Sequence, residues 1–180
     1  MTPTDPDLIL RCLTSDDTAA FGDLVRRHQS AVRGFLRHLT RGDSARSDDL
    51  AQETFIRAWR GLAGYRGGSR FGTWLLGIAY NLFRNERRGQ RNDPAFDAGN
   101  EFPAAASTGN LSDLRQDLAS ALDRLPGDER TALALSLQFS LTHEEIAATT
   151  GWPLGTVKTH LSRGKEQLRG LLAAWNPSPP

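Results

Sequence analysis

The feature that most constrains the fold is a long stretch without helical periodicity in the middle of the chain. Gly89 to Asn110 is rich in glycine, alanine, asparagine and proline, and its apolar residues follow no regular spacing. On both sides of it, apolar residues recur three and four positions apart, as on one face of an α-helix, and no strand-like alternation competes. An unstructured connection this long argues against one compact domain. We therefore predict an all-α fold of two small helical domains joined by a flexible linker, with bounds at 1–90, 91–110 and 111–175.

Helical spacing in the first domain predicts one short helix followed by three longer ones. The short helix covers Asp7 to Leu13, and the next begins after the Ser15–Asp17 cap and is broken at Arg41–Asp43. The other two run from about Ser47 to Leu62 and from Phe71 to about Arg88. The helix from Ser47 carries a stripe that we expect to be buried, formed by Ala51, Phe55, Ala58, Trp59 and Leu62.

The second domain is expected to contain two helices followed by a helix-turn-helix. The two helices run from Leu111 to Leu125 and from Asp128 to Phe139, with a Pro-Gly turn between them. In the stretch from Leu141 to Leu171, Thr142 and Glu145 have the spacing of a capping box. A glycine turn and Pro153, which suits the first turn of a helix, then introduce the last helix.

The outer side of that last helix is polar and basic, whereas Val157, Leu161 and Leu168 form its inner stripe. A helix that enters the major groove must expose such side chains, so we predict that this segment reads duplex DNA. An ordinary helical hairpin is the alternative. The exposed residues are Lys158, Thr159, Ser162, Arg163 and Lys165.

Two further surfaces are indicated in the first domain. Asp49, Gln52 and Glu53 share one side of a helix and form an acceptor-rich patch, which is either solvated surface or a docking site for a basic partner. Between Thr54 and Arg91 there are eight arginines and one acid, Glu86. Aromatic residues alternate with these arginines, a pattern that suits single-stranded nucleic acid, although the same aromatics can form core.

Several functional classes are disfavoured by the sequence. The single cysteine, Cys12, excludes an internal disulfide and is expected to be packed, with a redox sensor as the alternative. His28 and His38 are expected to pack or to face solvent rather than bind a ligand. His143 begins a zinc-protease-like motif, but Ala147 stands where the second ligand is needed, so we expect no enzyme, metal or cofactor. No signal peptide or membrane span is recognised, which predicts a cytoplasmic protein.

Four motifs, in the right order and spacing, make the chain resemble the extracytoplasmic-function (ECF) group of bacterial sigma factors, within the sigma-70 family of RNA polymerase. The resemblance covers about Phe21 to Leu172. The motifs are Asp48–Phe55 (DDLAQETF), Tyr65–Leu75 (YRGGSRFGTWL), Leu125–Arg130 (LPGDER) and Pro153–His160 (PLGTVKTH).

The resemblance implies that residues 1–90 form sigma region 2, which binds core polymerase and the −10 promoter element, and that residues 111–175 form region 4, which reads the −35 element. Asp49, Gln52 and Glu53 would dock on a basic coiled coil of the β′ subunit. The implied partners are core RNA polymerase, through its β′ and β subunits, promoter DNA and an anti-sigma factor.

The resemblance also implies roles for single residues in promoter melting. Tyr65 and Asn81 match positions that line a pocket for an unstacked base, and Trp74 belongs either to this site or to the core. Four arginines are expected to contact phosphates of the −10 DNA: Arg70, Arg84, Arg87 and Arg88.

In region 4, the outward-facing residues named above would face the −35 groove, and Arg163 can bind guanine bidentately. His160 stands where the family often has arginine, which weakens any transfer of base preference. The acidic linker residues Asp93, Asp97 and Glu101 resemble a family segment that runs through the polymerase channels. An independent helix-turn-helix repressor is the rival, but it explains neither the acidic patch nor the aromatic and arginine-rich helix.

Overall fold

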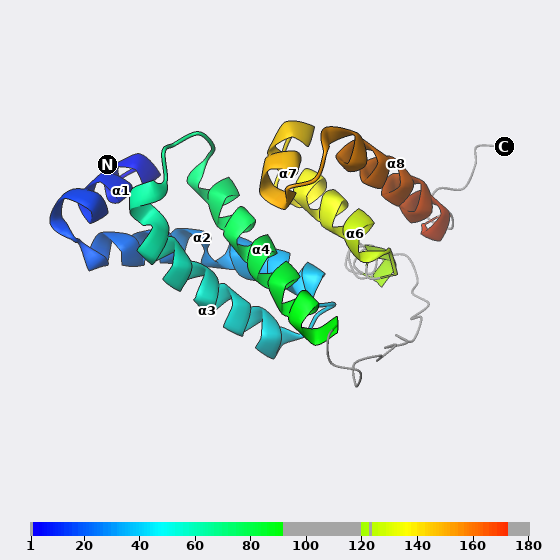
Figure 1. Cartoon of the computed structure of the whole chain (residues 1–180), viewed down its shortest axis with the longest axis horizontal. Helices are drawn as coiled ribbons and strands as arrows, with labels where there is room; N and C mark the ends of the chain where they lie inside the picture. Colours follow the sequence, from blue (N-terminus) through cyan, green and yellow to red (C-terminus); the bar gives the residue numbers. More distant parts are fainter. Residues whose placement is uncertain (1, 92–119, 123, 173–180) are drawn as a thin grey trace. The chain divides into compact units, whose positions relative to one another are not determined.

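The computed structural model of the protein describes residues 2–91, 120–122 and 124–172 (Figure 1). Every regular element in these residues is a helix, which confirms the predicted all-α class. The chain divides into two compact units, one of residues 1–88 together with 148–151 and one of residues 89–147 and 152–180. Nearly all of the predicted linker, and most of the helix predicted from Leu111 to Leu125, lies outside the described residues.

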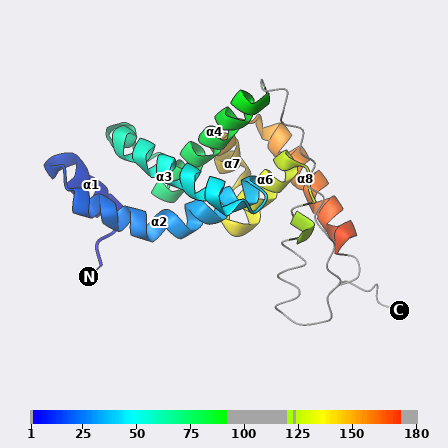
Figure 2. The same cartoon turned by 90° about the horizontal axis from the view of Figure 1, so that it is seen from below.

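The first unit consists of α1 (Asp5–Ser15), α2 (Thr18–Leu39), α3 (Ser44–Gly61), the 3₁₀ turn η1 (Leu62–Gly64) and α4 (Phe71–Arg91). Helix α1 packs on α2, and α2 packs along α3 (Figure 1, Figure 2). The fully buried side chains at its centre are Leu8, Leu24, Val32, Phe35, Leu36 and Leu75. Each apolar side chain of this size contributes about 1.5–3 kcal/mol when it leaves water.

Two aspartates decide where helices begin in this unit. Asp17 caps α2 by accepting a hydrogen bond from the backbone N–H of Ala20 at 2.9 Å. Asp43 caps α3 in the same way, with the N–H of Arg46 at 3.0 Å. The predicted start of α3 at Ser47 was therefore wrong by one turn, because Asp43 was assigned to the preceding break instead of to the cap that it forms.

The helices described after residue 126 are α6 (Gly127–Leu133), the π-helical turn η2 (Ala134–Gln138), α7 (His143–Thr150) and α8 (Leu154–Leu171). The helix predicted from Asp128 to Phe139 is present, but its second half is π-helical rather than α-helical. Helix α8 packs on α6. The side chains of Leu133, Leu135, Ile146 and Val157 are fully buried.

Helix α8 comes close to α6 at Gly164. This residue is buried, and a Cβ atom built on it would lie 2.9 Å from Cδ1 of Leu133 and 3.4 Å from Cβ of Glu129. Glycine is therefore required for the two helices to approach this closely. The contact fixes which side of α8 faces the unit's interior.

Candidate functional site

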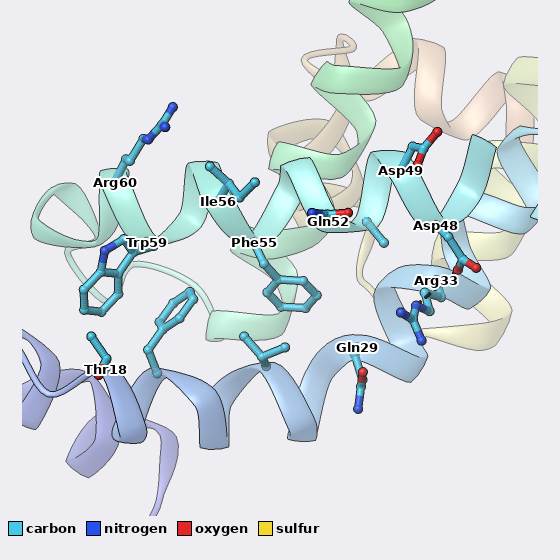
Figure 3. A pocket seen from close by; sticks show the side chains of 13 residues that line it. Thr18, Gln29, Arg33, Asp48, Asp49, Gln52, Phe55, Ile56, Trp59 and Arg60 are labelled. Carbon is cyan, nitrogen blue, oxygen red and sulfur yellow. Dashed lines mark ion pairs between the residues drawn. The ribbon is translucent and has the colours of Figure 1, made fainter. Parts of the chain in front are cut away.

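A groove of about 660 Å³ runs between α2 and α3 (Figure 3). Its floor is apolar, and the ring of Phe21 on α2 lies 4.9 Å from that of Trp59 on α3. Phe55 and Trp59 point from α3 toward α2 in Figure 3. Its polar rim includes Arg33 and Asp48, whose Nε and Oδ1 atoms are 3.2 Å apart.

The groove corrects one prediction and adds residues that were not predicted to form a site. Phe55 and Trp59 were expected in a buried stripe, but both are only half-buried and line the groove with Ile56, which is 37 % exposed. Periodicity identifies a helix face that avoids water, and it does not distinguish a packed core from an open apolar groove. Phe21 and Val25 contribute apolar lining from α2.

The three predicted docking residues do not share one environment. Asp49 and Gln52 are exposed and line the groove between α2 and α3. Asp49 also lines a second groove, between α3 and α4, together with Glu53. Glu53 is half-buried and accepts a hydrogen bond of 2.7 Å from Nε of Arg57, one turn along α3. Asp49 therefore lies on the ridge that separates the two grooves.

Tyr65 and Trp74 belong to one aromatic cluster, with Phe71 as the third ring. The ring centroids of Tyr65 lie 5.5 Å from Phe71 and 5.2 Å from Trp74, and those of Phe71 and Trp74 are 5.5 Å apart. Phe71 is buried, whereas the other two are half-buried, so Trp74 is neither wholly core nor free surface. The cluster presents ring surface at the start of α4.

The hydroxyl of Tyr65 is held within its own loop. It donates a hydrogen bond of 2.5 Å to the backbone carbonyl of Ser69. Burial, followed by the negative charge of Asp5, raises the pKa of Tyr65 above its usual value. The phenol is therefore protonated at neutral pH and remains a donor.

The predicted phosphate-binding arginines follow along α4. Arg70, Arg87, Arg88 and the nearby Asn81 are exposed, and Arg84 is half-buried. The guanidinium of Arg87 lies over the ring of Phe83 at 5.7 Å, and that of Arg46 lies over the same ring at 5.6 Å. Arg46 also pairs with Glu86 at 2.9 Å, which ties α3 to α4. The exposed residues leave α4 with a basic and polar outer surface.

The helix-turn-helix has the local structure that its sequence predicts. The N–H of Thr142 donates to Oε2 of Glu145 at 2.8 Å, and the N–H of Glu145 donates to Oγ1 of Thr142 at 3.2 Å. Gly151 then adopts a φ of +74°, a conformation that other residues rarely accept. The capping box and the glycine turn are both confirmed.

Helix α8 separates its two sides as predicted. Val157 and Leu161 are buried and Leu168 is half-buried. All five residues predicted to face DNA are exposed: Lys158, Thr159, Ser162, Arg163 and Lys165.

His160 differs from these five neighbours on α8. It is half-buried, and its ring centroid lies 4.9 Å from that of Trp152 in the turn. From the sequence, His160 stood out only as a departure from the family pattern, and nothing in the sequence singled out Trp152. The ring contact indicates that His160 supports the turn rather than extending the exposed surface.

Comparison with known proteins places these surfaces in a family. Residues 24–92 match the family description "Sigma-70 region 2", and residues 115–168 match "Sigma-70, region 4". The RNA polymerase sigma factor CarQ of Myxococcus xanthus is 38% identical over 156 residues, which cover 85% of this chain and 89% of CarQ. The ECF RNA polymerase sigma-E factor of Escherichia coli K12 is 34% identical over 180 residues, or 92% of each chain.

The chain belongs to the ECF group of sigma-70 family sigma factors. Its fold is also similar to that of the sigma factor RpoE of Bartonella quintana, solved with the anti-sigma factor NepR. The TM-score is 0.67 and the identity 29%, over 85% of this chain and 96% of that one. As an ECF sigma factor, the protein acts in promoter-specific transcription initiation by RNA polymerase.

Two observations bear on other roles of this sigma factor. Among the described residues, no group of three or more His, Cys, Asp or Glu side chains is placed to hold a metal ion. None of the helices in the described part of the chain combines the length and apolar character needed to cross a bilayer.

Proposed function

We propose that this sigma factor divides its work among three surfaces: the groove between α2 and α3, the loop and outer side at the start of α4, and the outer side of α8. The groove docks core polymerase, the second surface melts the −10 element, and the third reads the −35 element. The observation that carries the proposal is that each predicted set of residues lies beside a surface of matching chemistry.

Docking on polymerase is supported by the combination of an apolar groove and an acidic rim. A helical partner with basic side chains can insert apolar residues between Phe55 and Trp59 while its cations meet Asp49. Gln52 adds an amide that can pair in the same interface. A coiled coil of the β′ subunit has the chemistry that this groove accommodates. Glu53, which binds Arg57 on the other side of the ridge, is assigned a supporting role.

Melting is supported by the aromatic cluster and the arginines beside it. Unpairing a base costs a few kcal/mol, and stacking on aromatic rings returns about 1–3 kcal/mol per base. The half-buried rings of Tyr65 and Trp74 supply such a surface, with Asn81 about two turns after Trp74 on α4. Phosphates of the opened strand would be neutralised by Arg70, Arg84, Arg87 and Arg88.

Reading of the −35 element is supported by the exposed side of α8. Arg163 is assigned to guanine, because a guanidinium can donate to both O6 and N7. Lys158, Thr159, Ser162 and Lys165 are assigned to neighbouring bases and phosphates. The hydroxyl of Thr159 donates to the carbonyl of Gly155 at 2.9 Å, and its oxygen can still accept a bond from DNA.

The chain is also proposed to bind an anti-sigma factor, because a similar sigma factor has been solved in complex with one. We assign the protein to the cytoplasm, where core polymerase and promoters meet. Its surfaces bind and position, whereas the chemistry of RNA synthesis belongs to the polymerase. The chain is therefore not itself assigned an enzymatic activity.

The proposal is tested by reconstituting transcription from core polymerase, the purified chain and a promoter library, with mapping of start sites. We expect starts at a defined distance from paired −10 and −35 sequences. Asp49→Lys is expected to abolish both polymerase association and these starts, while its helical circular dichroism stays unchanged. Strong and specific binding of the chain to duplex promoters without polymerase would instead support an independent repressor.

A further inference from the structure

The start of α1 is joined to α2 through the carboxylate of Asp5. One oxygen of Asp5 accepts a hydrogen bond from Nη1 of Arg27, and the other lies 2.8 Å from Nε2 of His28. Nη2 of Arg27 also donates to the backbone carbonyl of Pro3 at 2.8 Å. Asp5 and His28 retain only 24% and 16% of their side-chain exposure, so the pair is largely shielded from water.

The His28 ring also contacts the start of α4. Its centroid lies 5.4 Å from that of Phe71, in an edge-on arrangement with an interplanar angle of 69°. A Cβ atom built on Gly72 would lie 3.4 Å from Nδ1 of His28, so the ring lies close to the first turn of α4. His28 therefore fills the space between α2 and the first turn of α4.

Phe71 passes this contact on to the aromatic cluster. It is 3% exposed and lies edge-on to the ring of Tyr65, with an interplanar angle of 81°. A continuous series of contacts thus runs from Asp5 through His28 and Phe71 to Tyr65. The loop that carries Tyr65 contains Gly67 and Gly68, and glycines leave a loop with little stiffness of its own.

We propose that Asp5 and His28 are positioning residues for the melting loop, residues 65–70. They fix Phe71, and Phe71 holds the ring of Tyr65 in place before DNA arrives. This inference rests on the proposed melting role of Tyr65 and adds α1 to that site. A surface that captures an unpaired base gains most when it is already ordered, because ordering the loop at that moment would offset the stacking energy.

Limited trypsin digestion of the free full-length chain tests the positioning directly. The loop contains two cleavage sites, Arg66 and Arg70. Asp5→Asn and His28→Ala are each expected to raise the cleavage rate at these sites about five-fold, with cleavage elsewhere unchanged. His28→Gln can keep a bond to Asp5 without the ring, and it serves if His28→Ala does not fold.

Arg11→Ala is the matched control, because Arg11 pairs with Asp17 at 2.6 Å and also joins α1 to the beginning of α2. Neither residue belongs to the aromatic cluster, so the loss of this pair should leave the loop as resistant as in the wild type. Unchanged loop cleavage in the Asp5 and His28 variants would overturn the proposal. So would an equal rise across all sites, which would mean that the pair serves general stability.

A second measurement links the loop to melting. With core polymerase, Asp5→Asn and His28→Gln are expected to slow open-complex formation on a duplex promoter about five-fold and to leave a pre-melted template unaffected. A slower reaction on both templates, or on neither, would overturn the link between these residues and melting. Tyr65→Ala in the same assay separates the two hypotheses. If Tyr65→Ala does not slow open-complex formation, the proposed melting role of Tyr65 is wrong. The trypsin digestion still decides, independently, whether Asp5 and His28 position the loop.

Discussion

Gly164 of α8 lies so close to Leu133 of α6 that a single added carbon would come within 2.9 Å of its Cδ1 atom. Leu133 is fully buried and cannot move freely away. The outer side of α8, with the residues assigned to the −35 element, is therefore oriented by a contact on the opposite side of the same helix.

Gly164→Ala is expected to destabilise the second unit by about 1–3 kcal/mol, because overpacking forces the helices apart. Gly170→Ala is the matched control on the same helix. No atom lies within 4 Å of a Cβ built there, so the higher helix propensity of alanine should leave stability unchanged or raise it by up to ~1 kcal/mol. Urea unfolding of both variants provides the comparison, and equal stabilities would refute the close-packing argument.

Ile56→Lys is expected to weaken binding to core polymerase at least ten-fold, or about 1.4 kcal/mol, because a charge would enter the apolar groove. Ile56 is 37% exposed, so the fold should tolerate lysine. Leu10→Lys changes a more exposed leucine on α1, outside the groove, and should bind normally. Fluorescence anisotropy of labelled chain against core polymerase measures both; similar losses for the two variants would remove the groove from the interface.

Arg163→Ala is expected to cost ~1–3 kcal/mol on the preferred −35 sequence and to relax the choice of base at one position. Lys165→Ala provides the contrast, since a lysine that contacts phosphate should weaken all sequences by a similar factor. Binding of holoenzyme to a panel of −35 variants distinguishes the two patterns. If Arg163→Ala weakened binding to all sequences equally, Arg163 would be reassigned to a contact with the DNA backbone.

Tyr65→Ala is expected to impair open-complex formation on duplex promoters by about ten-fold or more, in line with 1–3 kcal/mol of base stacking. A pre-melted template should be used normally, because unpairing is no longer required. Tyr65→Phe keeps the ring but removes the hydrogen bond to Ser69. Its rate of open-complex formation should lie between those of the wild type and Tyr65→Ala. If Tyr65→Ala lost activity equally on the duplex and the pre-melted template, a role of Tyr65 in melting would be excluded.

Asp17 makes stability depend on pH at the acidic end. Its carboxylate accepts a hydrogen bond from the N–H of Ala20 and another from Arg11, and these bonds hold its pKa below the usual value. A lowered pKa in the folded state contributes stability above the unfolded value, near pH 4, and loses it as pH falls through the folded value. The melting temperatures of wild type and Asp17→Asn should differ at neutral pH and converge below about pH 4. A constant difference would mean that the charge of Asp17 is not involved.

Local signals in the sequence were sufficient for much of the fold. The capping box forms because Thr142 and Glu145 are three residues apart. The exposed side of α8 was identified from the spacing of its polar and apolar residues along one helix. The all-α class followed from apolar spacing alone. The roles of the exposed residues remain predictions, because the arrangement of side chains on a free chain does not show what they contact in a complex.

Features that depend on two elements were not predictable from one of them. Phe55 and Trp59 have the spacing of a core, and only the position of α2 leaves a groove beside them. The need for glycine at position 164 depends on its contact with α6, which the sequence of α8 alone does not show. Likewise, His28 connects α2 to other helices only through its contacts with Asp5 of α1 and Phe71 of α4.

The contact between Arg87 and Phe83 has a thermodynamic consequence for the basic side of α4. A guanidinium that rests over a ring has already lost part of its rotamer freedom, a loss of about 0.5–1.5 kcal/mol that a free arginine would incur on meeting a phosphate. Arginines ordered in this way would capture a transiently frayed strand more readily than arginines of equal charge that sample many conformers.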